Sequence, residues 1–197
     1  MGFWYKLFGQ KKNSPVEEVN SPYLPEKRDD VEIVFAKKFT LKGGKFIYSE
    51  DSKSTSKFFK LILEENHWNL DDILCFDHQL SERFGLKHSK NHFNPKHFKA
   101  LFIGCEYLVA NKGTILVCHH QIKEYKLKLL PDFFIVFSGL NNFVNDVSEG
   151  MTEIKKKYTD QLPTNITTLN VKNSEDENDF LSYGNSAKNL YLVLQDH

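Results

Sequence analysis

The chain has 197 residues, of which 40% are hydrophobic, and its 26 basic and 26 acidic side chains leave no formal net charge. A chain of this length can bury a hydrophobic core and fits one domain, because domains of about 100 to 200 residues are the common case. The balanced charge excludes attraction to nucleic acid or anionic lipid by an overall basic field, so any binding must depend on local features.

The first part of the chain predicts an arm that precedes the domain. Its apolar start is too short to span a bilayer and lacks the order of regions found in a signal peptide. Pro15, Pro22 and Pro25 then fall among charged and polar residues, a composition typical of linkers. We therefore expect a flexible arm over residues 1–28, a single domain over residues 29–197 and no membrane span.

The first half of the domain alternates predicted helices and strands. The spacing of apolar residues from Val31 to Phe39 predicts a helix that ends at Gly43-Gly44, although the first of these residues also alternate as in a strand. The other elements expected here, in chain order, are a strand at 45–48, a helix capped by Ser52, a strand at 73–76, and a helix that Asp77 caps and Gly85 ends.

The second half continues this alternation. The expected elements are strands at 100–103, 113–118 and 133–137, a helix opened by Asn141 or Asn142 with Lys155, Lys156 and Lys157 in its last turn, and strands at 165–171 and 189–195. The polar and acidic residues 172–188 predict a mobile loop. Because parallel strands need helical crossovers, the alternation predicts an α/β fold with a mostly parallel sheet covered by helices.

A glycine-containing turn is the best candidate for a binding site. Gly113 has no Cβ, so its backbone can adopt positive φ and a ligand can approach its N–H closely. Gly113 N–H and the Thr114 hydroxyl would hold a small anionic ligand, and Lys112 would add positive charge. Asn111 is a neutral amide and cannot act as a base, so Glu106 would have to carry any catalysis. The alternative is a tight turn that leads into a buried strand.

Histidines give little indication of a metal site. His88, His92 and His97 lie among lysines and are interrupted by Pro95, which favours a solvated loop over a metal or nucleic-acid site. His119-His120 follows a predicted strand, and adjacent residues on an extended chain point to opposite faces.

Cysteines and nucleotide motifs are equally uninformative. Cys75, Cys105 and Cys118 are scattered in or beside apolar stretches, without the spacing of an iron–sulfur or disulfide framework. They suit buried thiols in a reducing cytoplasm. No glycine-rich nucleotide motif is present. We therefore expect no stoichiometric iron, zinc or flavin, no other cofactor and a cytoplasmic location.

The order of these motifs resembles the LUD (lactate-utilisation) domain family, typified by the C component of the bacterial lactate oxidation system. The family pattern is a Gly-x-Asp/Glu-x-x-x-Ala-x-x-Gly-Thr/Ser run, an apolar strand, a Leu-x-x-x-Pro entry into a second strand, and a last strand that ends in Asp. The residues that fit these places are Gly104, Glu106, Ala110, Gly113, Thr114, Pro131 and Asp196. The resemblance implies the NagB/RpiA/CoA-transferase-like fold and a site that includes Gly104 with the turn.

The resemblance also implies a function in the oxidation of lactate or a related 2-hydroxy acid, beside iron–sulfur partner proteins. Many family members carry glutamate at the place of Asn111, and residues 167–177 lack the Gly-Pro and Arg of the family's segment before the last strand. These departures favour a non-redox accessory or regulatory component over an enzyme. The alternatives are an acyl-transfer or isomerase-type enzyme that uses Glu106 with Gly113 and Thr114, and a ligand-free interaction module.

Overall fold

The computed structural model describes residues 29–88, 94–172 and 187–196. The predicted arm and most of the predicted loop at 172–188 lie outside these residues. The helices are α2 (Val31–Leu41), α3 (Ser52–Glu65), α4 (His78–Phe84), α5 (His119–Ile122) and α6 (Val147–Lys157). The strands are β1 (Lys45–Ser49), β2 (Ile73–Cys75), β3 (Ala100–Ile103), β4 (Tyr107–Val109), β5 (Thr114–Val117), β6 (Phe133–Gly139), β7 (Phe143–Val144), β8 (Thr167–Val171) and β9 (Ala187–Gln195).

The described strands form one mixed sheet in the order β2-β3-β6-β9-β8-β5-β4-β7, and β1 pairs with β9. β2, β3, β6, β9 and β1 are parallel to their neighbours in this half of the sheet. β5 is antiparallel to both β4 and β8, so β4 and β5 form a hairpin. The structure therefore confirms an α/β fold with a mostly parallel sheet, and it adds an antiparallel hairpin that the sequence did not predict.

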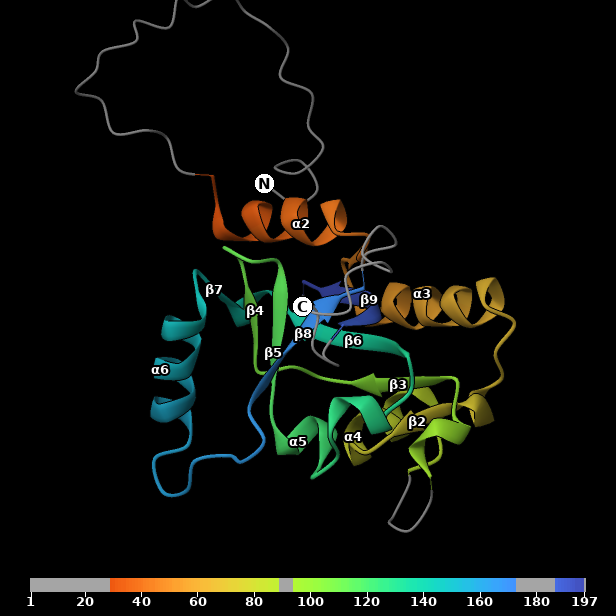
Figure 1. Cartoon of the computed structure of the whole chain (residues 1–197). Helices are drawn as coiled ribbons and strands as arrows, with labels where there is room; N and C mark the ends of the chain where they lie inside the picture. The colour runs from red at the N-terminus through yellow and green to blue at the C-terminus, as the bar shows by residue number, and fades with distance from the viewer. Residues whose placement is uncertain (1–28, 89–93, 173–186, 197) are drawn as a thin grey trace, which may run out of the picture.

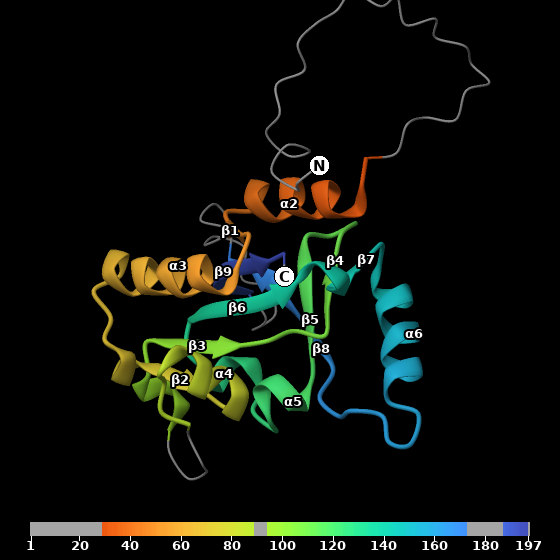
Figure 2. The ribbon, with the colours of Figure 1, turned by 180° about the vertical axis from the view of Figure 1, so that it is seen from behind.

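The parallel strands are buried on both faces, as their nearly continuous apolar runs require. In β3, Phe102 packs on Phe59 of α3 and Phe84 of α4, with ring centroids 4.9 Å and 4.8 Å apart. Leu101 and Ile103, on either side of Phe102 in this strand, belong to a separate hydrophobic core to which α2 and the hairpin also contribute. Figures 1 and 2 show α2 lying across one end of the hairpin and α6 beside it, away from α3.

Two predicted helix starts need correction. Asp51, and not Ser52, caps α3, because its carboxylate accepts the Ser54 N–H at 2.6 Å while Ser52 is the first helical residue. The helix expected to open at Asn141 or Asn142 begins at Val147, since Asp146 accepts the Glu149 N–H at 2.9 Å. Residues 140–142 form a 3-10 turn, and β7 follows them before the helix begins.

The α3 cap gives a first prediction. Asp51→Ala removes the acceptor for the Ser54 N–H, so thermal unfolding should begin at a lower temperature, with the midpoint reduced by about 2–4 °C. Ser52→Ala is the comparison variant, because Ser52 is already helical and its hydroxyl accepts from Arg83 at 3.2 Å and Gln195 at 3.5 Å instead of from a helix N–H. Thermal unfolding followed by circular dichroism checks the pair. A larger loss for Ser52→Ala than for Asp51→Ala would contradict the corrected cap.

No described helix combines the length and apolar character needed to cross a membrane.

Candidate functional site

Helix α2 covers the turn that the sequence indicated as a binding site. Lys38 Nζ donates to the carbonyl oxygen of Asn111 at 2.7 Å, and Lys42 Nζ donates to that of Lys112 at 2.6 Å. Gly113 has a φ of +57°, and a Cβ at this position would lie 2.7 Å from the backbone nitrogen of Phe39. The close approach that glycine permits is therefore made by α2.

Thr114 and Gly104 are the remaining predicted ligand-binding residues. Thr114 is buried, and its hydroxyl has no hydrogen-bond partner among the described residues. Gly104 follows β3, where an added Cβ would meet only the carbonyl oxygen of Phe137, at 3.9 Å. Anion binding by Gly104 and by the turn from Asn111 to Thr114 stays a prediction.

Glu106 lies at the opposite end of the hairpin from this turn. β4 begins directly after Glu106, and Val109 at its far end pairs with Thr114. The carboxylate of Glu106 instead lies beside Cys118, with Oε1 3.2 Å from Sγ. Figure 1 shows α2 at the turn of the hairpin and α5 at its other end. The structure thus does not bring Glu106 together with Gly113, and we place the candidate site at the α5 end.

The Glu106 carboxylate is buried and surrounded by hydrogen-bond donors. Gln121 Nε2 from α5 donates to Oε1 at 2.8 Å, and Lys157 Nζ from the last turn of α6 donates to Oε2 at 2.9 Å. The hydroxyl of Tyr158 lies 3.1 Å and 3.2 Å from the two oxygens. With the Cys118 thiol, four side chains contact one carboxylate, so both of its oxygens are occupied.

The charges at this site are fixed by these contacts. Burial alone would raise the pKa of Glu106, but hydrogen bonds from Gln121, Lys157 and Cys118 outweigh it and lower that pKa. Burial raises the pKa of the Cys118 thiol to about 12, and the neighbouring Glu106 adds to this increase. The site therefore holds an ionised carboxylate beside a protonated thiol. A carboxylate with a lowered pKa and no free oxygen is a weak general base.

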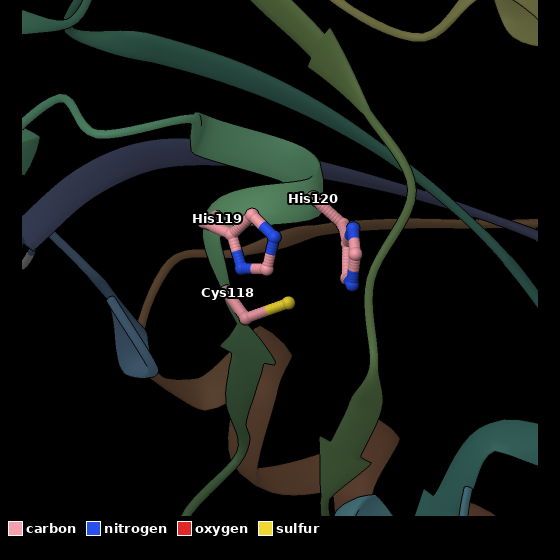
Figure 3. Close-up of side chains that lie close together, drawn as sticks. All are labelled: Cys118, His119 and His120. Carbon is pink, nitrogen blue, oxygen red and sulfur yellow. The ribbon is translucent and has the colours of Figure 1, made fainter. Parts of the chain in front are cut away.

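His119 and His120 are not extended, which corrects the sequence expectation. The chain turns from β5 through Cys118 into α5, so the two rings lie together, with centroids 4.0 Å apart (Figure 3). His120 also stacks on Tyr158, with centroids 5.1 Å apart, and His119 Nδ1 accepts the Thr164 N–H at 3.0 Å. Both histidines thus border the Glu106 site.

Sequence reasoning missed three members of this site. Gln121, Lys157 and Tyr158 contact Glu106 from 15, 51 and 52 residues away. Lys157 was noted only for its place in the last turn of a helix, and no spacing connected it to Glu106. Of the other histidines, His97 is exposed and His92 lies outside the described residues.

A mixed, mostly parallel sheet flanked by helices defines an α/β domain. In this domain the buried Glu106 carboxylate lies at one end of the hairpin. The sequence model of the LUD domain matches residues 33–194, and the chain belongs to this family, which confirms the resemblance. The fold is similar to the crystal structure of a DUF162 family protein from Deinococcus radiodurans at 1.70 Å resolution, with a TM-score of 0.60 and 16% sequence identity. The similarity covers 87% of this chain and 99% of that chain. A comparison with curated proteins finds no significant match.

Proposed function

We propose that this LUD-domain chain is a non-redox accessory or regulatory component in the oxidation of lactate or a related 2-hydroxy acid, and that it acts beside iron–sulfur proteins. The LUD domain supplies the link to lactate utilisation. The observation that favours an accessory role is the state of Glu106, whose two oxygens are taken by Lys157, Gln121 and Tyr158. This carboxylate stabilises the end of the hairpin and is poorly prepared for proton transfer.

The proposal predicts no lactate turnover by the purified chain alone. Removal of hydride or electrons from lactate needs a redox acceptor, and the described cysteines are separate thiols without the spacing for a cluster. The measurement is lactate-dependent reduction of a soluble dye by the full chain. Steady turnover without any added protein would contradict an accessory role.

Association with the redox proteins is the positive test. The full chain should form a saturable complex with the iron–sulfur lactate-oxidation proteins of the same organism, measured by sedimentation. An unrelated iron–sulfur protein of similar size is the control, because it measures association that does not depend on the lactate pathway. Equal sedimentation of the chain with and without its partners would count against the proposal.

An acyl-transfer or isomerase-type enzyme is the second candidate function. The observation that favours it is the Cys118 thiol, which lies 3.2 Å from the Glu106 carboxylate. A substrate would have to displace the donors on Glu106 before this carboxylate could accept the thiol proton and leave Cys118 as a nucleophile. On this reading Glu106→Gln abolishes turnover while the fold is kept. Equal turnover by wild type and Glu106→Gln would remove the carboxylate mechanism.

A further inference from the structure

Three donor atoms of the kind that bind borderline transition metals converge where β5 passes into α5. The ligand atoms of Cys118, His119 and His120 all lie within 4.8 Å of one another. Figure 3 shows the thiol and both imidazole rings on the same side of this junction. Around a tetrahedral zinc ion, with bonds of about 2.0–2.3 Å, neighbouring donor atoms lie about 3.5 Å apart. Small side-chain rotations would therefore close the three donors around an ion.

We propose that Cys118, His119 and His120 form a zinc site, which replaces the expectation of no bound zinc drawn from the sequence, goes beyond the proposed function and does not depend on it. One thiolate and two imidazoles form a donor set that suits zinc and disfavours magnesium and calcium, which prefer oxygen ligands. Cys118 is buried, His119 is half-buried and His120 is exposed, so the ion can enter from the His120 side. The fourth position is left to water, because the Glu106 oxygens beside the Cys118 sulfur already accept from Gln121 and Lys157.

The surroundings of the three residues support such a site. Lys157 would repel a cation, but its charge is balanced by Glu106 at 2.9 Å. When zinc binds, the Cys118 thiol loses its proton to solvent, and the Zn–S bond replaces the S–H group. Glu106 then loses one donor and keeps Gln121, Lys157 and Tyr158. Stacking on Tyr158 restricts the His120 ring, which reduces the entropy lost when it coordinates a metal.

Coordination must also disturb one contact that the structure shows. His119 Nδ1 accepts the backbone N–H of Thr164 at 3.0 Å, so the neutral ring carries its own hydrogen on Nε2. If zinc binds Nδ1, it displaces the Thr164 N–H. If zinc binds Nε2, the ring hydrogen moves to Nδ1, which can no longer accept a hydrogen bond. Either geometry releases the Thr164 amide, so its hydrogen exchange should become faster when zinc is bound.

Titration of the metal-free full chain with Zn²⁺ against a competing chelator tests the proposal. We expect one equivalent to bind, Mg²⁺ not to compete, and His120→Ala to weaken the affinity by more than about 10-fold. His120 is exposed, so this variant should fold normally, whereas Cys118→Ser changes a buried position and is a secondary test. His97→Ala, which removes another exposed histidine, should bind zinc as wild type does.

Two results would overturn the proposal. One is wild-type zinc affinity in His120→Ala, which would assign binding to other residues. The other is one equivalent of bound zinc with unchanged exchange of the Thr164 amide, which would exclude coordination by His119. Neither measurement involves lactate or a partner protein, so the zinc site can fail while the accessory function stands, and the reverse also holds.

Discussion

Gly113→Ala should destabilise the protein by about 2–5 kcal/mol. The left-handed backbone of Gly113, with a φ of +57°, costs an alanine about 1–2 kcal/mol. The added Cβ would also lie 2.7 Å from Phe39 N and 2.8 Å from Lys38 C. These are backbone atoms and cannot rotate away, so α2 must shift over a packed core, which typically costs about 1–3 kcal/mol more. Urea unfolding of both proteins measures the difference.

Gly85→Ala is the matched control for this clash. Gly85 ends α4 with a φ of +67°, but nothing lies within 4 Å of an added Cβ. This variant should therefore lose only the cost of the backbone conformation, about 1–2 kcal/mol. Equal losses in the two variants would show that α2 does not lie against the turn. The turn from Asn111 to Thr114 would then again be open to a ligand.

Glu106→Gln should destabilise the folded state by about 1–3 kcal/mol at pH 7, because hydrogen bonds to a buried charged group are among the stronger ones. Glu153→Gln is the matched control: its carboxylate pairs with the exposed Lys156, at 2.6 Å. Solvent screens an exposed pair strongly, so the control should change stability little. Urea unfolding of the three proteins at pH 7 provides the comparison.

Acid should remove the difference between wild type and Glu106→Gln. The pKa of Glu106 is lowered in the folded state, so its contribution to stability is fully present above the pKa of an unfolded glutamate. That contribution is lost as the pH falls through the lower pKa of the folded state. Two results would contradict the conclusion that hydrogen bonds stabilise the charged form of Glu106. One is a stability difference that grows in acid, and the other is a loss in Glu106→Gln no larger than the loss in Glu153→Gln.

Local sequence signals were sufficient for most of the parallel half of the fold. β3 and β6 are continuous apolar runs, and Asp77 and Gly85 bound α4 as predicted. β4 was missed because it has only three residues and follows β3 after a short polar break. The sequence pattern named Ser52 as the cap of α3 in place of Asp51, because both side chains can accept the N–H bond and the pattern does not fix which residue begins the helix.

The candidate site was only partly predictable, because its members meet through long-range packing. Glu106 was identified from its place in the motif before the turn, but its partners Lys157 and Tyr158 come from the end of α6. The same motif suggested that Glu106 and Gly113 act together, yet the hairpin places them at opposite ends. His119 and His120 were separated by assuming that the strand continues, whereas α5 begins there.

Reconstitution tests the accessory function most directly. The rate of lactate-dependent electron transfer by the iron–sulfur proteins of the same organism is measured with and without the full chain, and with the chain alone. The account predicts that the chain alone has no activity and that the rate of the iron–sulfur proteins depends on its presence. A rate unaffected by the chain, or turnover by the chain alone, would contradict it.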